Sequence, residues 1–452
     1  MIRLINWRGL PYYIAKSTLG PHQWKTNLRL VKNSNIEILS SQYLKQLLEY
    51  ACQHVPFYRA LHLANQPLHE YPLLTKADVR AHYDYHKTDE LMKYHWSEAT
   101  TSGSTGDTLR IVRTQDFLAW VETADMWFYN RLLSTSRRAC VSSSKIYVWG
   151  QSGDPHRLSV WTRLARFVAP IMWLDPYEAL SEEQLLYYAL TIRRVKPAYI
   201  WGFAGVLYEI AKTALRHHVH LQGSKFVVSS GETLHTFMRP VIEEGFGCRV
   251  YDYYGSTEAG RVAGECHAGN LHTFDFSCHV EVLDPSGQPT PPGQEGRIVL
   301  TPLHNYAMPL IRYDTADMAQ VGPRECPCGC ELGTLSRIAG RTVEFFVTRE
   351  GHLISGGRIA KMLRICHWII GFQIFQNDID QLTIFYCRTA DTVASQQDIE
   401  KINEGIGEVL GVSCHIDWQE VAEIPRTANG KRPYARSLVW EDKQPGSLWE
   451  LE

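Results

Sequence analysis

The segment from Thr100 to Gly106 consists entirely of serine, threonine and glycine residues. Glycines let a backbone approach a phosphate closely, and hydroxyl and free N–H groups donate to its oxygens. The segment is not a Walker loop, because Asp107 follows Gly106 where that motif needs lysine. A flexible surface loop is the alternative interpretation. The following stretch Leu109-Arg110-Ile111-Val112 favours a loop between two strands instead.

A second candidate motif is the decapeptide Tyr251–Gly260, which follows a predicted strand. Ligands of open α/β sheets bind beyond the carboxyl ends of the strands. Gly255 permits a sharp turn, Thr257 offers a donor to a phosphate, and Glu258 offers a carboxylate to Mg²⁺. The alternative is a tight turn with a solvated acid.

A third group combines the Cys326-Pro327-Cys328-Gly329-Cys330 run with an upstream cysteine and two histidines. Zn²⁺ prefers four thiolate or imidazole ligands in a tetrahedron. The predicted ligands are Cys266, His272, Cys326 and Cys328. Cys330 or His267 could replace one of them, and free thiols are the alternative to any metal. Four protein ligands leave no open position, so the predicted site is structural.

The remaining cysteines have apolar neighbours and are predicted to be small core residues. These are Cys248, Cys278, Cys366 and Cys387.

Short apolar runs alternating with amphipathic segments must position these motifs. With 452 residues, the chain is expected to form two or three units. Helices are predicted over Ile36–Ala60 and over Leu74–His86, which has a Thr75 cap. The following alternation predicts a mostly parallel sheet with helices. Its predicted strands are Lys145–Trp149, Pro170–Leu174, Ala198–Trp201, Phe226–Ser229 and Arg249–Tyr254, and its predicted helices are Arg157–Phe167, Ser181–Arg194, Val206–His217 and Thr233–Glu244.

The sequence pattern changes after Gly264. Short strand-like runs separated by turn residues predict a β-rich subdomain there. Its predicted strands are His272–Phe276, His279–Leu283, Gly296–Thr301 and Leu310–Tyr313. Beyond about residue 340 a smaller α+β unit is predicted, with strands Phe372–Gln376, Gln381–Tyr386 and Val412–Val421 around a helix over Ser395–Leu410.

The predicted fold class is therefore α/β, with a large N-terminal domain at 1–340 and a small, mobile α+β lid domain at 341–452. The β subdomain with the zinc site occupies 266–330.

Taken together, the motifs resemble those of the adenylate-forming superfamily of acyl-CoA synthetases, adenylation domains and luciferases. The resemblance is closer to the phenylacetate–CoA ligase and capsule-biosynthesis branch and runs from about residue 40 to 440. Further stretches agree in the family's order: Gly231-Glu232, the ribose segment Pro309–Asp317, the hinge approach Arg337–Arg341 and the lysine loop Pro425–Lys431. Such an ordered set is far more specific than any one motif.

The resemblance implies a role at each matching position. The phosphates would be lined by Thr101, Ser102, Gly103, Ser104, Thr105 and Gly106. The nucleotide would also contact Gly231, Glu232, Tyr254, Gly255, Asp317 and Arg341, with Tyr254 between the adenine and acyl sites and Asp317 on the ribose hydroxyls. The catalytic residues would be Thr257 at the α-phosphate, Glu258 on Mg²⁺, and Lys431 reaching from the lid domain to the carboxylate and α-phosphate.

Two positions depart from the family pattern. Val343 stands where an acidic or basic hinge residue is common, so rotation of the lid domain is the less secure part of the resemblance. Ala316 stands where glycine is common in the ribose segment.

The resemblance implies activation of a small carboxylic acid by ATP as acyl-AMP, with release of pyrophosphate and then acyl transfer, most commonly to coenzyme A. Aromatic residues near strand ends favour an aromatic acid, although ordinary core packing is the alternative. They are Trp149, Trp201, Phe203 and Tyr254. A carrier-protein thiol, an amine or an alcohol as acceptor, and a non-catalytic nucleotide-binding relative, are the alternatives.

The composition of the chain limits which classes of partner are expected. Lys and Arg number 46 and Asp and Glu 48, a net charge of −2, which argues against general nucleic-acid binding. No apolar stretch has the length of a membrane span, and the first ten residues lack a signal-peptide core. A cytoplasmic monomer or homodimer without membrane contact is expected.

Overall fold

The computed structural model describes most of the chain between residues 23 and 441. The described ranges are 23–101, 109–134, 143–149, 171–174, 181–234, 238–284, 286–339, 345–349, 353–355, 359–360, 362–363, 366, 368–388, 392–422 and 435–441. The predicted helix Arg157–Phe167 lies outside them.

The first described segment is helical, as the sequence predicts. Asn35 caps α3 by accepting from the Ile38 N–H, and Pro56 at the first position of α4 separates the two helices. Thr75 and Asp78 form a capping box on α5. The elements are α2 (Gln23–Asn33), α3 (Ile36–His54), α4 (Pro56–Ala60), η1 (Leu68–Glu70), α5 (Lys76–Ala81), η2 (Tyr83–His86) and η3 (Leu91–Lys93).

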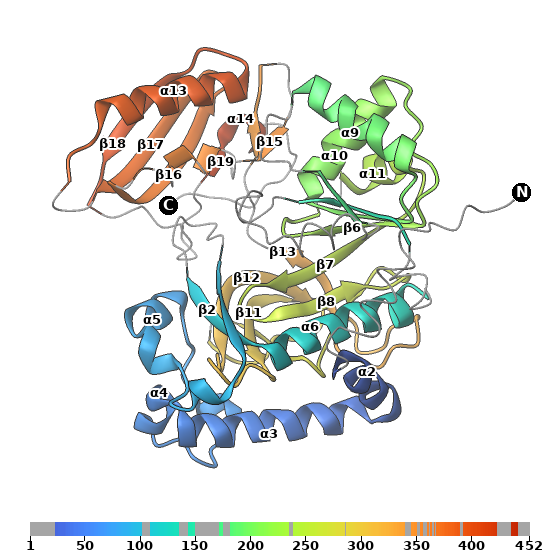
Figure 1. The fold of residues 1–452 in the computed structure, drawn as a ribbon, viewed down its shortest axis with the longest axis vertical. Coiled ribbons are helices and arrows are strands. Elements are labelled where there is room, and N and C mark those ends of the chain that lie inside the picture. The colour runs from blue at the N-terminus through green and yellow to red at the C-terminus, as the bar shows by residue number, and fades with distance from the viewer. Residues whose placement is uncertain are drawn as a thin grey trace, which may run out of the picture.

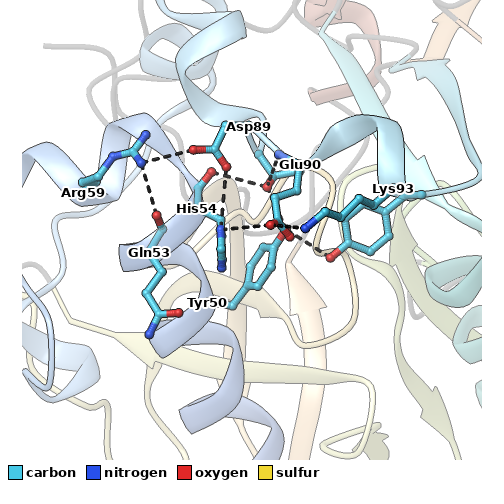
Figure 2. Close-up of polar contacts among 9 residues, drawn as sticks. Tyr50, Gln53, His54, Arg59, Asp89, Glu90 and Lys93 are labelled. Carbon is cyan, nitrogen blue, oxygen red and sulfur yellow. Dashed lines mark hydrogen bonds and ion pairs between the residues drawn. The ribbon is translucent and has the colours of Figure 1, made fainter.

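A polar network fastens α3 and α4 to the segment that leads into the first strand (Figure 2). Arg59 donates to the Gln53 carbonyl at 3.3 Å and to Asp89 at 3.1 Å. His54 Nδ1 lies 3.6 Å from Glu90, which also pairs with Lys93. The Asp89 N–H donates to the His54 carbonyl at 2.9 Å. The network joins these helices to residues 89–93, just before β1 begins at Trp96.

Eleven of the described strands form one mixed sheet in the order β10-β11-β12-β13-β9-β8-β7-β6-β5-β3-β4. From β4 to β7 the pairing is parallel, and from β7 to β10 it is antiparallel. The strands are β3 (Lys145–Val148), β4 (Ile171–Leu174), β5 (Tyr199–Gly202), β6 (Phe226–Ser230), β7 (Val250–Ser256), β8 (Gly260–Glu265), β9 (Leu271–Thr273), β10 (Cys278–Leu283), β11 (Glu295–Pro302), β12 (Tyr313–Val321) and β13 (Thr334–Ala339).

Two helical layers bury the parallel half of the sheet (Figure 1). On one face, α9 (Glu182–Val195), α10 (Ala204–Arg216) and α11 (Met238–Phe246) pack over alternate strand residues such as Ile200 and Val227. On the other face, α6 (Gln115–Trp127) and the π-helical turn η4 (Phe128–Leu132) pack over Trp201 and Tyr253. This period of two places neighbouring strand residues in different environments.

The predicted β-rich part is present, with one error. Leu310–Tyr313 is not a strand, because β12 begins only at Tyr313. Arg312 adopts a left-handed φ of 54°, and its buried guanidinium donates to the carbonyls of His69 and Tyr71. A tertiary anchor at Arg312 therefore overrides the local strand pattern.

The C-terminal residues form a separate four-stranded sheet in the order β18-β17-β16-β19, with α13 (Gln396–Leu410) across it. The antiparallel pair β16 (Ile369–Asp378) and β17 (Gln381–Arg388) agrees with the prediction. The other strands of this sheet are β18 (His415–Glu420) and β19 (Ala435–Ser437); nearby lie β14 (Phe345–Val347), β15 (Leu353–Ser355) and α14 (Leu438–Glu441). A large α/β region with a smaller α/β domain confirms the predicted fold class.

Candidate functional site

The turn between β7 and β8 carries Thr257 and Glu258, as the motif predicts. Gly255 is required there, since a Cβ at this position would lie 2.5 Å from the Gly260 carbonyl oxygen. Glu258 is buried, and its Oε1 accepts a hydrogen bond from the Tyr313 hydroxyl at 3.2 Å. Thr257 is half-buried next to it.

Tyr254 and Asp317 meet although 63 positions separate them. The Tyr254 hydroxyl donates to Asp317 Oδ2 at 2.8 Å. Three strands lie between β7 and β12 in the sheet order, so the sheet curls to bring them together. Ala316, just before Asp317, has a φ of 60°, which explains why glycine suits that position.

The predicted phosphate loop lies in sequence between two antiparallel strands, β1 (Trp96–Thr100) and β2 (Arg110–Thr114), as expected. Thr101 is buried at its base, where its N–H donates to the Leu109 carbonyl at 2.8 Å. Lys76 on α5 donates to Thr101 Oγ1 at 3.2 Å. The remaining predicted loop residues, Ser102, Gly103, Ser104, Thr105 and Gly106, lie outside the described residues.

Gly231 and Glu232 follow β6 at the carboxyl edge of the sheet. Gly231 has a φ of 81°, and a Cβ there would lie 2.8 Å from the Trp149 ring. Glu232 accepts from the Gly205 N–H at 3.0 Å and so satisfies the start of α10. Burial raises the pKa of Glu232 to about 7, against the lowering effect of that hydrogen bond.

The four predicted pocket aromatics separate into different environments. Trp149 and Phe203 stack on each other at 4.1 Å beside Gly231. Trp201 lies on the opposite face of the sheet, with its ring 4.9 Å from that of Tyr253. Tyr254 points toward Asp317.

The four predicted metal ligands converge. One ligand atom from each of Cys266, His272, Cys326 and Cys328 lies within 4.8 Å of the others. His272 Nε2 lies 3.2 Å from Cys328 Sγ, and its Nδ1 lies 3.2 Å from the Leu332 carbonyl, an arrangement that orients the ring toward the thiols. The donor set and its closure fit a structural Zn²⁺.

Cys266 also has the charge character of a metal ligand. Burial raises the pKa of Cys266, but hydrogen bonds from His272 and from the N–H groups of Asn270 and Ala268 outweigh it and lower this pKa to about 6. A thiolate is therefore accessible near neutral pH, as metal ligation requires.

Arg341 and Lys431 lie outside the described residues, as does the hinge position Val343. Their assignments stay predictions.

Comparisons with known proteins show relatives that match nearly the whole chain. Residues 346–436 match the model of the CapK C-terminal domain. Protein CapK of Staphylococcus aureus is 23% identical over 443 residues, covering 93% of each chain, and the phenylacetate-coenzyme A ligase of Thermus thermophilus is 23% identical over 451 residues, covering 90% of this chain and 98% of the relative.

A solved structure of 2-hydroxyisobutyryl-CoA ligase, in complex with 2-HIB-AMP and CoA, has a TM-score of 0.60 and 22% identity, covering 90% of this chain and 91% of the ligase. The chain is thus similar to relatives of the kind that the sequence motifs predicted, those of the adenylate-forming superfamily. Within the superfamily, it is similar to CapK and the phenylacetate–CoA ligases over nearly its whole length. In the described part of the chain, every helix is too short or too polar to span a membrane.

Sequence reasoning missed two groups beside the site. One is Lys76, whose contact with the phosphate loop no motif signals. The other joins Asp125 on α6 to Tyr253 and Arg261. Arg261 immediately follows the strand-end decapeptide, and this proximity was the available signal.

Proposed function

We propose that this chain activates a small, aromatic carboxylic acid with ATP, forming an acyl-adenylate and pyrophosphate, and then transfers the acyl group to a thiol, that of coenzyme A. The Tyr254–Asp317 contact carries the proposal, because it unites the strand-end motif with the ribose segment. The relatives named as acid–CoA ligases support the reaction class.

The residues have roles that suit this chemistry. A carboxylate is a poor acyl donor, and its attack on the α-phosphate turns its oxygen into part of AMP, a good leaving group. Thr101 and the loop after it would bind phosphates, and Asp317 would bind the ribose hydroxyls. Thr257 would donate to the α-phosphate, and Lys431 would approach it from the C-terminal domain.

Two metal ions, Mg²⁺ and Zn²⁺, would bind at separate sites. Glu258, buried beside the turn, would hold Mg²⁺, which neutralises phosphate charge when bound. Zn²⁺ would occupy the closed Cys266–His272–Cys326–Cys328 cluster and brace the β-rich part.

The test is pyrophosphate release with ATP and Mg²⁺ across aromatic and aliphatic acids, with and without CoA. We expect release with an aromatic acid and formation of its CoA thioester. Release without any thioester would redirect the second step to a carrier protein, amine or alcohol. Absence of release from folded, ATP-binding protein across all acids would support the non-catalytic alternative.

A further inference from the structure

The carboxylate of Asp125, the guanidinium of Arg261 and the phenol of Tyr253 meet on the face of the sheet that α6 covers. Arg261 Nε donates to Asp125 Oδ1 at 2.9 Å, and its Nη2 approaches Oδ2 at 3.4 Å. The Tyr253 hydroxyl donates to Asp125 Oδ1 at 2.7 Å. Asp125 thus holds the guanidinium in a fixed orientation and cancels its charge.

Aromatic rings surround this pair. The Arg261 guanidinium carbon lies 5.6 Å from the Tyr253 ring centre and 5.9 Å from that of Trp201, within cation–π range. Tyr147 lies 6.3 Å from Trp201 and stacks on Trp173 at 4.8 Å. Flat ring faces of this kind pack well against a planar, apolar ligand body.

Two donors in this group keep hydrogen-bonding capacity. Trp201 is only 5% exposed, and its Nε1 has no hydrogen-bond partner among the described residues. The contacts that Arg261 makes to described residues use Nε and Nη2, which leaves Nη1, and 36% of its side chain is exposed. The buried Trp201 donor is costly to leave without a partner, so an acceptor on a ligand that Arg261 Nη1 can also reach would satisfy it.

The group lies next to the nucleotide residues. Arg261 stands opposite Gly255 in the β7–β8 pairing. Tyr253 precedes Tyr254, and the two side chains point to opposite sides of β7. Strand β7 therefore presents Tyr254 to the proposed nucleotide site and the preceding residue, Tyr253, to this aromatic group.

We infer that Arg261, oriented by Asp125 and flanked by Trp201 and Tyr253, determines acid specificity by binding a neutral hydrogen-bond acceptor on the ring of an aromatic acid, away from the reacting carboxylate. This inference rests on the proposed function. A hydroxyl, a ring carbonyl or a ring nitrogen has the required chemistry. A second carboxylate does not match, because Asp125 already neutralises the guanidinium.

The test compares benzoate and phenylacetate with their ring-hydroxylated forms and with phthalate isomers, measuring kcat/KM for pyrophosphate release. Wild type is expected to prefer a hydroxylated acid by about tenfold or more, since a site built to bind a polar group rejects analogues that lack it. Arg261→Met should lose most of this preference by slowing the hydroxylated acid alone. Arg249→Met is the matched control, because Arg249 also pairs with a carboxylate, Glu265, and covers a tyrosine ring, that of Tyr251.

The outcomes separate the two proposals. Equal use of hydroxylated and plain acids by wild type, preference for a phthalate, or equal loss on all acids in Arg261→Met would overturn the specificity role. Absence of release with every acid would contradict the proposed function. Calorimetry with the same acids would then test the specificity role alone, and equal affinity of wild type and Arg261→Met for a hydroxylated acid would overturn it. Should Arg261→Met fail to fold, Arg261→Lys keeps the cation but loses the planar fork, and the same change in preference is expected.

Discussion

Two sites of this protein are built by the same two stretches of chain, yet they differ in openness. Tyr254 and Asp317 form one site, 63 positions apart. Cys266 and Cys326 form the other, 60 positions apart, with their sulfurs at 3.6 Å. The curled antiparallel half of the sheet returns one stretch to the other and so creates both.

The difference lies in what the meeting side chains leave available. At the Cys/His cluster, four ligand atoms face one another and would saturate a tetrahedral metal. At the Tyr254–Asp317 site, the neighbouring Thr257 is half-buried and remains accessible. The same topology thus supplies a closed brace and an open site, and variants should separate their effects.

The largest effect is expected from Lys431→Ala. Loss of a cation that stabilises transition-state charge should reduce adenylation by ~10²–10³. Thermal stability should stay close to wild type, since the open site is not the brace. Lys401→Ala, on the outer helix α13, is the control for removing a lysine from the same domain. Unchanged pyrophosphate release would remove Lys431 from the mechanism.

Cys266→Ser tests the closed site. Loss of a structural metal belongs to the most destabilising single changes, so we expect about 3 kcal/mol of lost stability and a lost equivalent of zinc by elemental analysis. Activity per folded molecule should change little.

Cys278→Ala is the matched control, because this buried cysteine on β10 lies outside the cluster. Equal metal content in wild type and Cys266→Ser would show that the cluster does not hold the ion.

Tyr254→Phe tests the open site more gently. It removes one hydrogen bond to Asp317, worth roughly 0.5–1.5 kcal/mol. We therefore expect a rise of up to about tenfold in KM for ATP, because Asp317 loses its orienting partner. Tyr187→Phe, an exposed tyrosine on α9, should have no such effect. A KM identical to wild type would mean that the contact does not position Asp317 for nucleotide.

A further expected effect concerns the pH dependence of stability and lies on β7 itself. Burial, and then the neighbouring Glu265, raise the pKa of Asp252 to about 7 from an ordinary value of 3.8. The folded state therefore holds a proton that the unfolded state releases, so stability should fall as pH rises from about 4 to about 7. Asp252→Asn should reduce this fall in urea unfolding without abolishing it, because the pKa of Glu232 is also raised to about 7. An unaltered slope would assign the fall to groups other than Asp252.

Much of the architecture follows from local patterns. Thr75 and Ser181 cap the helices that were predicted to begin at these residues, and the hairpin of β16 and β17 agrees with the predicted strand pair. Such features depend on neighbours in the chain, which the sequence displays directly. The local pattern did not predict where β12 begins. Arg312 adopts a left-handed backbone conformation and donates to carbonyls more than 240 positions away in the sequence.

By itself, the sequence determined the motif residues, their order, the α/β class and the identity of the converging cysteines and histidine. Only the tertiary structure decided that Tyr254 bonds to Asp317, that Lys76 reaches Thr101, and that Arg261 lies between aromatic rings with Asp125. These contacts join residues separated by 25 to 136 positions. Their geometry depends on how the sheet curls and on which face each side chain occupies, and a local pattern of residues encodes neither.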